Sequence, residues 1–157
     1  MSAAVPENTP TVEKTTRPTP AGVIYCRVAR HADLGGGTEQ LEIAAQRETA
    51  RCRAAELNVP IIDEFIDVGI PGTTIDRPEL RRLFDLAYAG RITHCIVDHQ
   101  YRLARTVADM IVIERELKRH GVSIAAADER SDIAHSIIYA LATEEEWQQL
   151  AAPSDPR

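Results

Sequence analysis

The sequence predicts an α/β fold in which a largely parallel central sheet is flanked by helices and followed by a long C-terminal helix. Two observations predict it. Short apolar segments rich in β-forming residues alternate with longer segments whose apolar residues recur at helical spacing, and capping or glycine signals punctuate them. Strands that alternate with helices in this way form parallel sheets, because each helix carries the chain back across the sheet.

Four strands are expected, and each is a short run of mostly apolar residues. They cover residues 23–28, 60–67, 94–98 and 122–128. In sheets of this kind ligands bind beyond the carboxyl ends of the strands. Arg27, Asp67 and the segment after Asp98 should therefore lie near one rim of the sheet.

Four helices are expected between and after the strands, over residues 38–57, 77–89, 106–120 and 132–150. The expected inner positions of the first helix are Leu41, Ala44, Ala45 and Cys52. Those of the third helix are Val107, Met110, Ile111 and Leu117. The last helix carries an apolar stripe made of Ile133, Ile137, Ile138, Leu141 and Trp147.

The second helix has the clearest boundary signals. Asp76 and Glu79 form a D-x-x-E capping box, Pro78 suits the first turn, and Gly90 supplies the stop. These signals predict a helix whose first turn is capped by its own neighbouring residues.

The length and composition indicate one folded domain with tails. The chain has 157 residues, of which 44% are hydrophobic and 27% charged. Residues 21–150 form the expected domain, 1–20 a disordered Pro/Thr-rich tail and 151–157 a C-terminal tail. We expect a cytoplasmic protein, because no segment is apolar enough to span a bilayer, the N-terminus lacks signal-peptide order, and Cys26, Cys52 and Cys95 form no CxxC pair.

Four arginines are the strongest candidates for a binding site. The net charge of −6 excludes a DNA binder that works by bulk charge, so any nucleic-acid role needs arginines concentrated in one place. Arg27 ends the first strand, Arg77 precedes a helix, and Arg102 and Arg105 lie three residues apart. A single surface arginine is usually only a solvated charge, but four that converge would suit a phosphate.

The motifs around these arginines resemble one known family. The segments "YCRVARH", "FIDVGIPGTTIDRPELRRLFDLA" and "YRLARTVADMIVIERELKRHGVSI" follow one another in the order seen in the N-terminal catalytic domain of serine recombinases, the family of resolvases, invertases and large serine integrases. The resemblance covers about residues 22–148. Its motifs are specific in combination: YxRV, then D-x-G-x-x-G-T-x-x-D-R-P-x-L, then R-L-x-R.

The resemblance implies a site-specific DNA strand-exchange enzyme with a resolvase-like fold. In that family a serine hydroxyl attacks a DNA phosphodiester and forms a 5′-phosphoseryl link, so no metal or other cofactor is needed. By position, Arg27, Arg77, Arg102 and Arg105 look like the arginines that bind and stabilise the reacting phosphate, and Asp67 looks like the family's carboxylate. The last helix, with Ile137, Leu141 and Glu145, resembles the family's dimerisation helix, although its apolar stripe could also be internal core.

This chain departs from the family pattern where the chemistry matters most. Ala29 occupies the position of the nucleophilic serine, Tyr101 that of the Asp in D-R-L-x-R, and Pro71 that of a small polar residue. The expected glutamine cannot be placed, since neither Gln40 nor Gln46 aligns cleanly. The chain therefore should be catalytically dead as written, and several departures together favour natural loss over an engineered change.

Three hypotheses remain open. The first is a serine-recombinase catalytic domain without its nucleophile, which binds DNA weakly because the C-terminus becomes acidic at 144–146. The second is a non-enzymatic dimerisation or regulatory module that pairs with itself, as a dimer or tetramer, or with an active recombinase. The third is another phosphate-binding α/β protein. A metal site at His94 and Cys95 is not expected, because neighbouring strand residues point to opposite faces.

Overall fold

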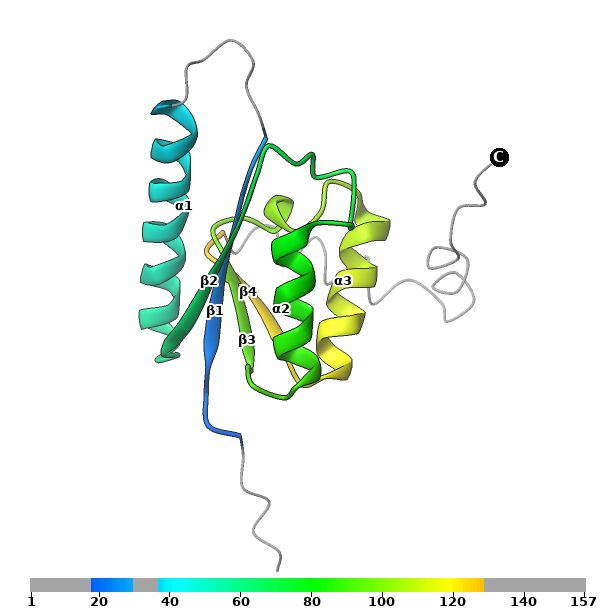
Figure 1. Cartoon of the computed structure of the whole chain (residues 1–157). Helices are drawn as coiled ribbons and strands as arrows, with labels where there is room; N and C mark the ends of the chain where they lie inside the picture. The colour runs from blue at the N-terminus through cyan, green and yellow to red at the C-terminus, as the bar shows by residue number, and fades with distance from the viewer. Residues whose placement is uncertain (1–17, 30–36, 129–157) are drawn as a thin grey trace, which may run out of the picture.

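The computed structural model describes residues 18–29 and 37–128 (Figure 1). Their core is a four-stranded sheet in the order β2-β1-β3-β4, and every pair of neighbouring strands is parallel. The strands are β1 (Gly22–Val28), β2 (Ile61–Val68), β3 (His94–Val97) and β4 (Ser123–Ala126). The predicted α/β class and parallel sheet are confirmed.

Three α-helices and one short 3-10 helix connect the strands. They are α1 (Gly37–Glu56), α2 (Pro78–Tyr88), η1 (Gln100–Arg102) and α3 (Val107–Arg119). Helix α1 covers one face of the sheet, and α2 and α3 cover the other (Figure 1). The loop that joins β2 to α2 crosses the carboxyl end of the sheet, where the predicted site lies (Figure 1).

Strand β1 lies inside the sheet, and all seven of its residues are buried. A strand covered on both faces needs side chains that tolerate burial throughout, which explains its nearly continuous apolar sequence. Its last residues pair with those of β2, so that Arg27 is opposite Asp67 and Tyr25 is opposite Phe65. The register therefore places the arginine and the carboxylate side by side at the carboxyl end.

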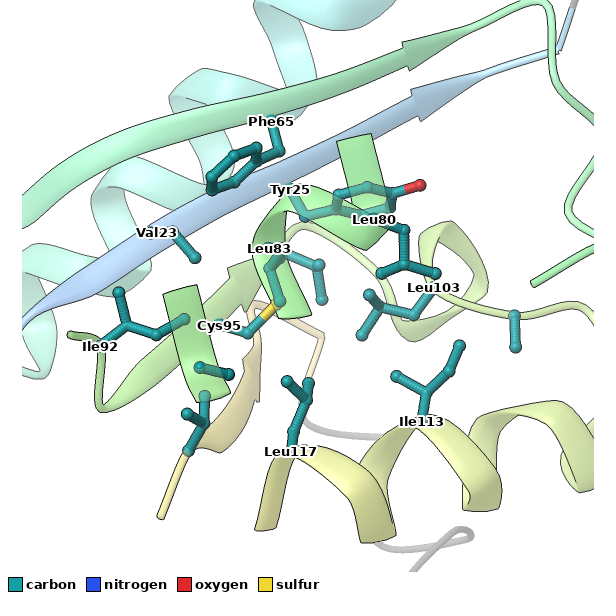
Figure 2. Close-up of a cluster of buried hydrophobic side chains, with 14 of the residues drawn as sticks. Val23, Tyr25, Phe65, Leu80, Leu83, Ile92, Cys95, Leu103, Ile113 and Leu117 are labelled. Atoms are coloured by element: carbon teal, nitrogen blue, oxygen red, sulfur yellow. The ribbon is translucent and has the colours of Figure 1, made fainter. Parts of the chain in front are cut away.

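The larger apolar core fills the space between the sheet and the α2 and α3 helices (Figure 2). Leu83 from α2 and Leu117 from α3 are fully buried against Val23 and Cys95 of the sheet. Tyr25 belongs to the same cluster, and Figure 2 shows its hydroxyl oxygen near Leu80 and Leu103. This core fixes the starts of α2 and α3 at the carboxyl end of the sheet.

Helix α1 presents a different face from the one that the sequence predicts. Leu41 is 73% exposed, and Ala44, Ala45 and Cys52 are also exposed. The buried residues are instead the i, i+4, i+8 series of Gln46, Ala50 and Ala54. Small alanines let the helix lie close to the sheet, and the contacts of Gln46 described below hold that face inward.

The third helix follows its prediction more closely. Met110, Ile111 and Leu117 are buried as expected, whereas Val107 is 48% exposed because it lies in the first turn, at the rim. The expected last helix, with Ile137, Leu141 and Glu145, and the tails 1–17 and 151–157 lie outside the described residues. No helix within the described ranges is long and apolar enough to cross a membrane.

Candidate functional site

The structure brings the four predicted arginines together at the carboxyl end of the sheet. They come from four separate positions: the end of β1, the residue before α2, the end of η1 and the turn before α3. Arg27 and Arg77 both donate to the carbonyl oxygen of Arg102, at 3.1 and 2.8 Å. The backbone N–H of Arg105 donates to the carbonyl of Gly72, which lies against the Arg27 guanidinium.

Arg27 is buried and ties two loops to the end of β1. Its side chain is 1% exposed. Besides the bond to Arg102, its Nη1 donates to the carbonyl of Ile70 at 3.2 Å and its Nη2 to the carbonyl of Tyr101 at 3.2 Å. The Arg27 guanidinium therefore holds the β2–α2 loop and η1 in place.

Arg77 is also buried, and both of its terminal nitrogens donate internally, whereas its Nε has no hydrogen-bond partner among the described residues. Its Nη1 donates to the hydroxyl of Tyr25 at 2.7 Å, and its Nη2 donates to the carbonyl of Leu103. The guanidinium lies over the Tyr25 ring, 5.5 Å from the centroid. Burial raises the pKa of Tyr25 above its ordinary value, so this hydroxyl stays protonated and can donate in turn.

Asp67 caps helix α2 from a neighbouring strand. Its carboxylate accepts from the Tyr25 hydroxyl at 2.8 Å and from the backbone N–H groups of Glu79 and Leu80, both at 3.2 Å. The predicted capping box is wrong, because Arg77 is the N-cap residue without a side-chain cap bond, and the Asp76 carboxylate instead pairs with Arg81. A buried carboxylate at the helix start satisfies the free N–H groups that the solvent-exposed Asp76 leaves unpaired.

The two remaining arginines lie at the surface. Arg102 donates from Nε and Nη2 to the carboxylate of Asp98, at 3.0 and 3.1 Å. Arg105 is exposed, and within residues 18–29 and 37–128 its guanidinium makes neither a hydrogen bond nor an ion pair. The nearby start of α3 is already capped by Thr106, whose hydroxyl accepts from the backbone N–H of Asp109 at 3.1 Å.

The site has a concentrated positive charge. The pKa of Arg27 is lowered from its usual value, first by burial and then by the positive charges of Arg105 and Arg77. Like charges that crowd one another in this way are relieved by an anion. Of the predicted site residues that lie in the described ranges, all except Ala29 carry charge, and Ala29 follows β1 directly and is half-buried.

Gln46 is a functional position that the sequence leaves unassigned. Its amide holds the backbone of Arg27 from both sides: Oε1 accepts from the Arg27 N–H at 3.0 Å, and Nε2 donates to the Arg27 carbonyl at 3.2 Å. Strand β3 pairs with β1 only as far as Ile24, so the Gln46 side chain replaces the missing strand at this point. The sequence does contain a signal for this inward position, because Gln46 lies four residues before Ala50 and eight before Ala54, on the same face of the helix.

Gly72 explains the close approach of the β2–α2 loop. A side chain there would have its Cβ 2.8 Å from Nη2 of Arg27 and 2.7 Å from Cγ of Arg105. Pro71 beside it is exposed, contributes its fixed backbone angle, and accepts a long hydrogen bond from the Thr74 N–H at its carbonyl, 3.5 Å away. His94 and Cys95 belong to β3, and the described residues contain no group of three or more side chains suited to a metal ion.

Comparisons with known proteins agree with this geometry. The family model described as "Resolvase, N terminal domain" matches residues 22–147. A search of curated proteins finds no match. The resemblance expected from the motifs is confirmed by the family model and by the structures below.

Three solved structures have the same fold at low identity. The N-terminal catalytic domain of TP901-1 integrase has 19% identity and a TM-score of 0.66, covering 84% of this chain and 99% of its own. A resolvase family site-specific recombinase from Streptococcus pneumoniae has 20% identity and a TM-score of 0.59, covering 83% and 90%. A serine recombinase from Sulfolobus solfataricus has 16% identity and a TM-score of 0.53, covering 85% and 99%.

Proposed function

Because the chain belongs to the resolvase N-terminal domain family, we propose that it is a serine-recombinase-type catalytic domain for site-specific DNA recombination that lacks its nucleophile at Ala29. It would work in the cytoplasm, on DNA and without a cofactor. The observation that carries the proposal is the meeting of Arg27, Arg77, Arg102 and Arg105 from four chain positions at the end of β1, which Ala29 directly follows. Their positive charge suits the phosphodiester on which such a domain acts.

The chemistry explains why Ala29 should abolish strand cleavage. A serine hydroxyl in this position would attack phosphorus, release the 3′ oxygen of the broken strand and keep the 5′ phosphate as an ester. A methyl group supplies no attacking oxygen. In a serine hydrolase the loss of the nucleophile costs on the order of a millionfold in rate, or about 8 kcal/mol of barrier. Here the loss should be complete, because the oxygen is itself a reactant.

We assign different parts in phosphate binding to the surface and buried arginines. The exposed Arg105 is free to meet a DNA phosphate, and Arg102 could do so by exchanging the Asp98 carboxylate for it. Arg27 and Arg77 already donate to backbone carbonyls, so they would act mainly by charge and by holding η1 in place. Asp67 acts through the start of α2 rather than on the phosphate.

The test restores the missing hydroxyl. The native chain and the Ala29→Ser variant are each mixed with an active serine recombinase and supercoiled DNA that carries the recombination sites of that enzyme. We expect the variant, but not the native chain, to become attached to a DNA 5′ end. Denaturing gels would reveal the adduct, and mass spectrometry would place it at position 29. Ala29→Gly is the matched control, because it changes the same residue without adding an oxygen.

A second variant keeps this test decisive. Ala29→Ser combined with Tyr101→Asp also restores the carboxylate that the resemblance leads one to expect at position 101. An adduct formed only by the double variant would show that the loss of function involved both positions. If both variants enter the recombinase complex and neither forms an adduct, the catalytic-domain proposal is wrong.

The alternative is a regulatory module that pairs with itself or with an active recombinase. It is favoured by the internal use of Arg27 and Arg77, which leaves the buried pair serving structure. On this hypothesis Ile137, Leu141 and Glu145 belong to the pairing helix. The native chain should then lower the recombination rate of the active enzyme in proportion to its concentration. Analytical ultracentrifugation that finds a monomer, and no complex with the recombinase, would contradict it.

A further inference from the structure

We propose that the exposed ring of Tyr101, backed by His99, is a platform on which an unpaired nucleobase stacks while Arg105 holds an adjacent phosphate. This inference rests on the proposed function, because it takes DNA as the ligand. It adds a binding site for a base to a site so far described only by its charges. Bases splayed from a duplex or in a single strand present the flat face that such a platform accepts.

The geometry of the two rings supports a platform. The Tyr101 and His99 centroids are 5.6 Å apart and their planes differ by 19°. Tyr101 is nonetheless 59% exposed, so one face of its ring is backed and the other is open. A stacked base would cover the open face of this ring and remove its apolar area from water.

The His99 ring and the backbone that carries Tyr101 are held in position by other contacts. Nε2 of His99 pairs with the Asp128 carboxylate at 3.1 Å. The Tyr101 carbonyl accepts from Arg27, and the N–H of Arg102 donates to the carbonyl of His99 at 3.0 Å, which closes the turn of η1. The ring of Tyr101 therefore projects from a fixed turn, and little ordering is required when a base binds.

The charge beside the platform suits a nucleotide. Arg105 lies close enough to Arg27 to lower its pKa, and Arg27 in turn bonds to the Tyr101 carbonyl. Arg105 is exposed, so a phosphate can reach it without breaking an internal bond. Tyr101 and Arg105 therefore both adjoin Arg27, the first through its backbone carbonyl and the second through its side chain, which brings the residue that carries the ring and a phosphate donor to the same buried arginine.

A second tyrosine–histidine pair provides a built-in contrast. Tyr88, at the end of α2, is 50% exposed, and its ring is tilted by 57° from that of His120 and stacks on Phe84 with the planes 12° apart. Burial, followed by the charge of the Glu116 carboxylate, raises the pKa of the Tyr88 hydroxyl. The two tyrosines differ in their distance from the arginine cluster, because Tyr88 lies at the opposite end of α2 from Arg77 (Figure 1).

The test compares two oligonucleotides of equal charge. One is a fluorescein-labelled single strand of about twelve thymidines, and the other replaces the central nucleotides with abasic sites, which keep every phosphate. Fluorescence anisotropy at low salt measures binding of the full chain to each. We expect the intact strand to bind about tenfold or more tightly than the abasic strand.

Four variants sharpen the result. Tyr101→Ala should remove the preference for the intact strand, whereas Tyr101→Phe and Tyr101→Trp should keep it, because each retains a flat ring. Tyr88→Ala is the matched control and should leave the preference unchanged. Circular dichroism would confirm that each variant is folded.

The outcomes separate this inference from the proposed function. Equal binding of both strands would overturn the platform and leave the phosphate site standing. No binding of either strand would overturn the platform, whereas the proposed function is judged separately by the adduct of the Ala29→Ser variant. A preference that survives in Tyr101→Ala would show that the base stacks elsewhere, and would also overturn the platform.

Discussion

The buried and the surface arginines of the carboxyl end show how one residue type serves two purposes. The buried pair, Arg27 and Arg77, is 1% and 0% exposed and donates to backbone carbonyls and to the Tyr25 hydroxyl. In the surface pair, Arg102 donates to the Asp98 carboxylate and weakly to the Arg27 carbonyl, and the Arg105 guanidinium makes neither a hydrogen bond nor an ion pair among the described residues. The buried pair thus builds the site, and the surface pair is available to a ligand.

The difference follows from the position of each residue in the chain. Arg27 lies on a strand inside the sheet, and Arg77 lies where a loop enters the core, so both must find internal acceptors. The carbonyls of 101–103 and of Ile70 supply them. Since the carbonyls of 101–103 belong to the segment that also carries the surface pair, the buried pair determines where the surface pair lies.

The largest expected effect is from Arg77→Met, which keeps the length of the side chain and removes its donors. It leaves the Leu103 carbonyl without its donor and removes one of the bonds to the Tyr25 hydroxyl and to the Arg102 carbonyl. We expect it to lower the free energy of unfolding by about 3–5 kcal/mol, measured by urea denaturation followed by circular dichroism. Arg81→Met on the same helix is the control, since its side chain is 68% exposed, and should cost below about 1 kcal/mol. Similar losses in the two variants would show that Arg77 is not a structural residue.

The second-largest effect is expected from removing the Gln46 side chain, which holds the backbone of Arg27. Gln46→Ala removes both hydrogen bonds to the Arg27 backbone and leaves a buried N–H and a buried carbonyl unpaired. We expect a loss of about 2–4 kcal/mol in the free energy of unfolding. Gln40→Ala makes the same substitution at an exposed position of the same helix and should cost less than about 0.5 kcal/mol. An unchanged midpoint for Gln46→Ala would mean that water can replace the amide.

The two glutamines also show where sequence reasoning reaches its limit. The fold could be predicted because strand and helix periods alternate without ambiguity, and the element bounds agree within a few residues. The inner face of α1 could not, because its buried stripe consists of two alanines and a glutamine while the more apolar Leu41 faces water. The Gln46 amide is needed because β3 pairs with β1 only as far as Ile24, which leaves the Arg27 backbone without a neighbouring strand on that side. That need arises from the tertiary structure.

The candidate site, too, could be predicted only in part from the sequence. The four arginines and Asp67 could be picked out from their motifs, and the parallel sheet places them at one end. Their partners could not be predicted. Asp76 satisfies the local rule for a helix cap, but Asp67, nine residues earlier in the sequence, does the capping because strand β2 brings it to the start of α2. A contact of this kind depends on strand register, which local sequence does not encode.

A smaller effect is expected at Gly72, which lies against both the buried Arg27 and the surface Arg105. Gly72→Ala places a Cβ against the guanidinium of Arg27 and the stem of Arg105, so either the loop or the arginines must move. We expect a loss of about 1–3 kcal/mol in the free energy of unfolding, measured by urea denaturation. Gly37→Ala, at the start of α1, has open space around it and should be neutral or slightly stabilising. Equal stability of the two variants would indicate that the loop is not packed on Arg27.

The smallest effect on stability, and the most informative for function, is expected from Arg105→Ala. Its guanidinium is exposed, so the free energy of unfolding should change by less than about 0.5 kcal/mol. Binding to labelled duplex DNA should weaken, and the slope of log affinity against log salt should become shallower by about one. Arg119→Ala removes the same charge at the far end of α3, where the side chain is 63% exposed, and should leave the slope unchanged. If both variants reduce the slope equally, the binding of this chain to DNA depends on its net charge alone. The comparison of buried and surface arginines would then explain the stability of the domain but not its binding of DNA.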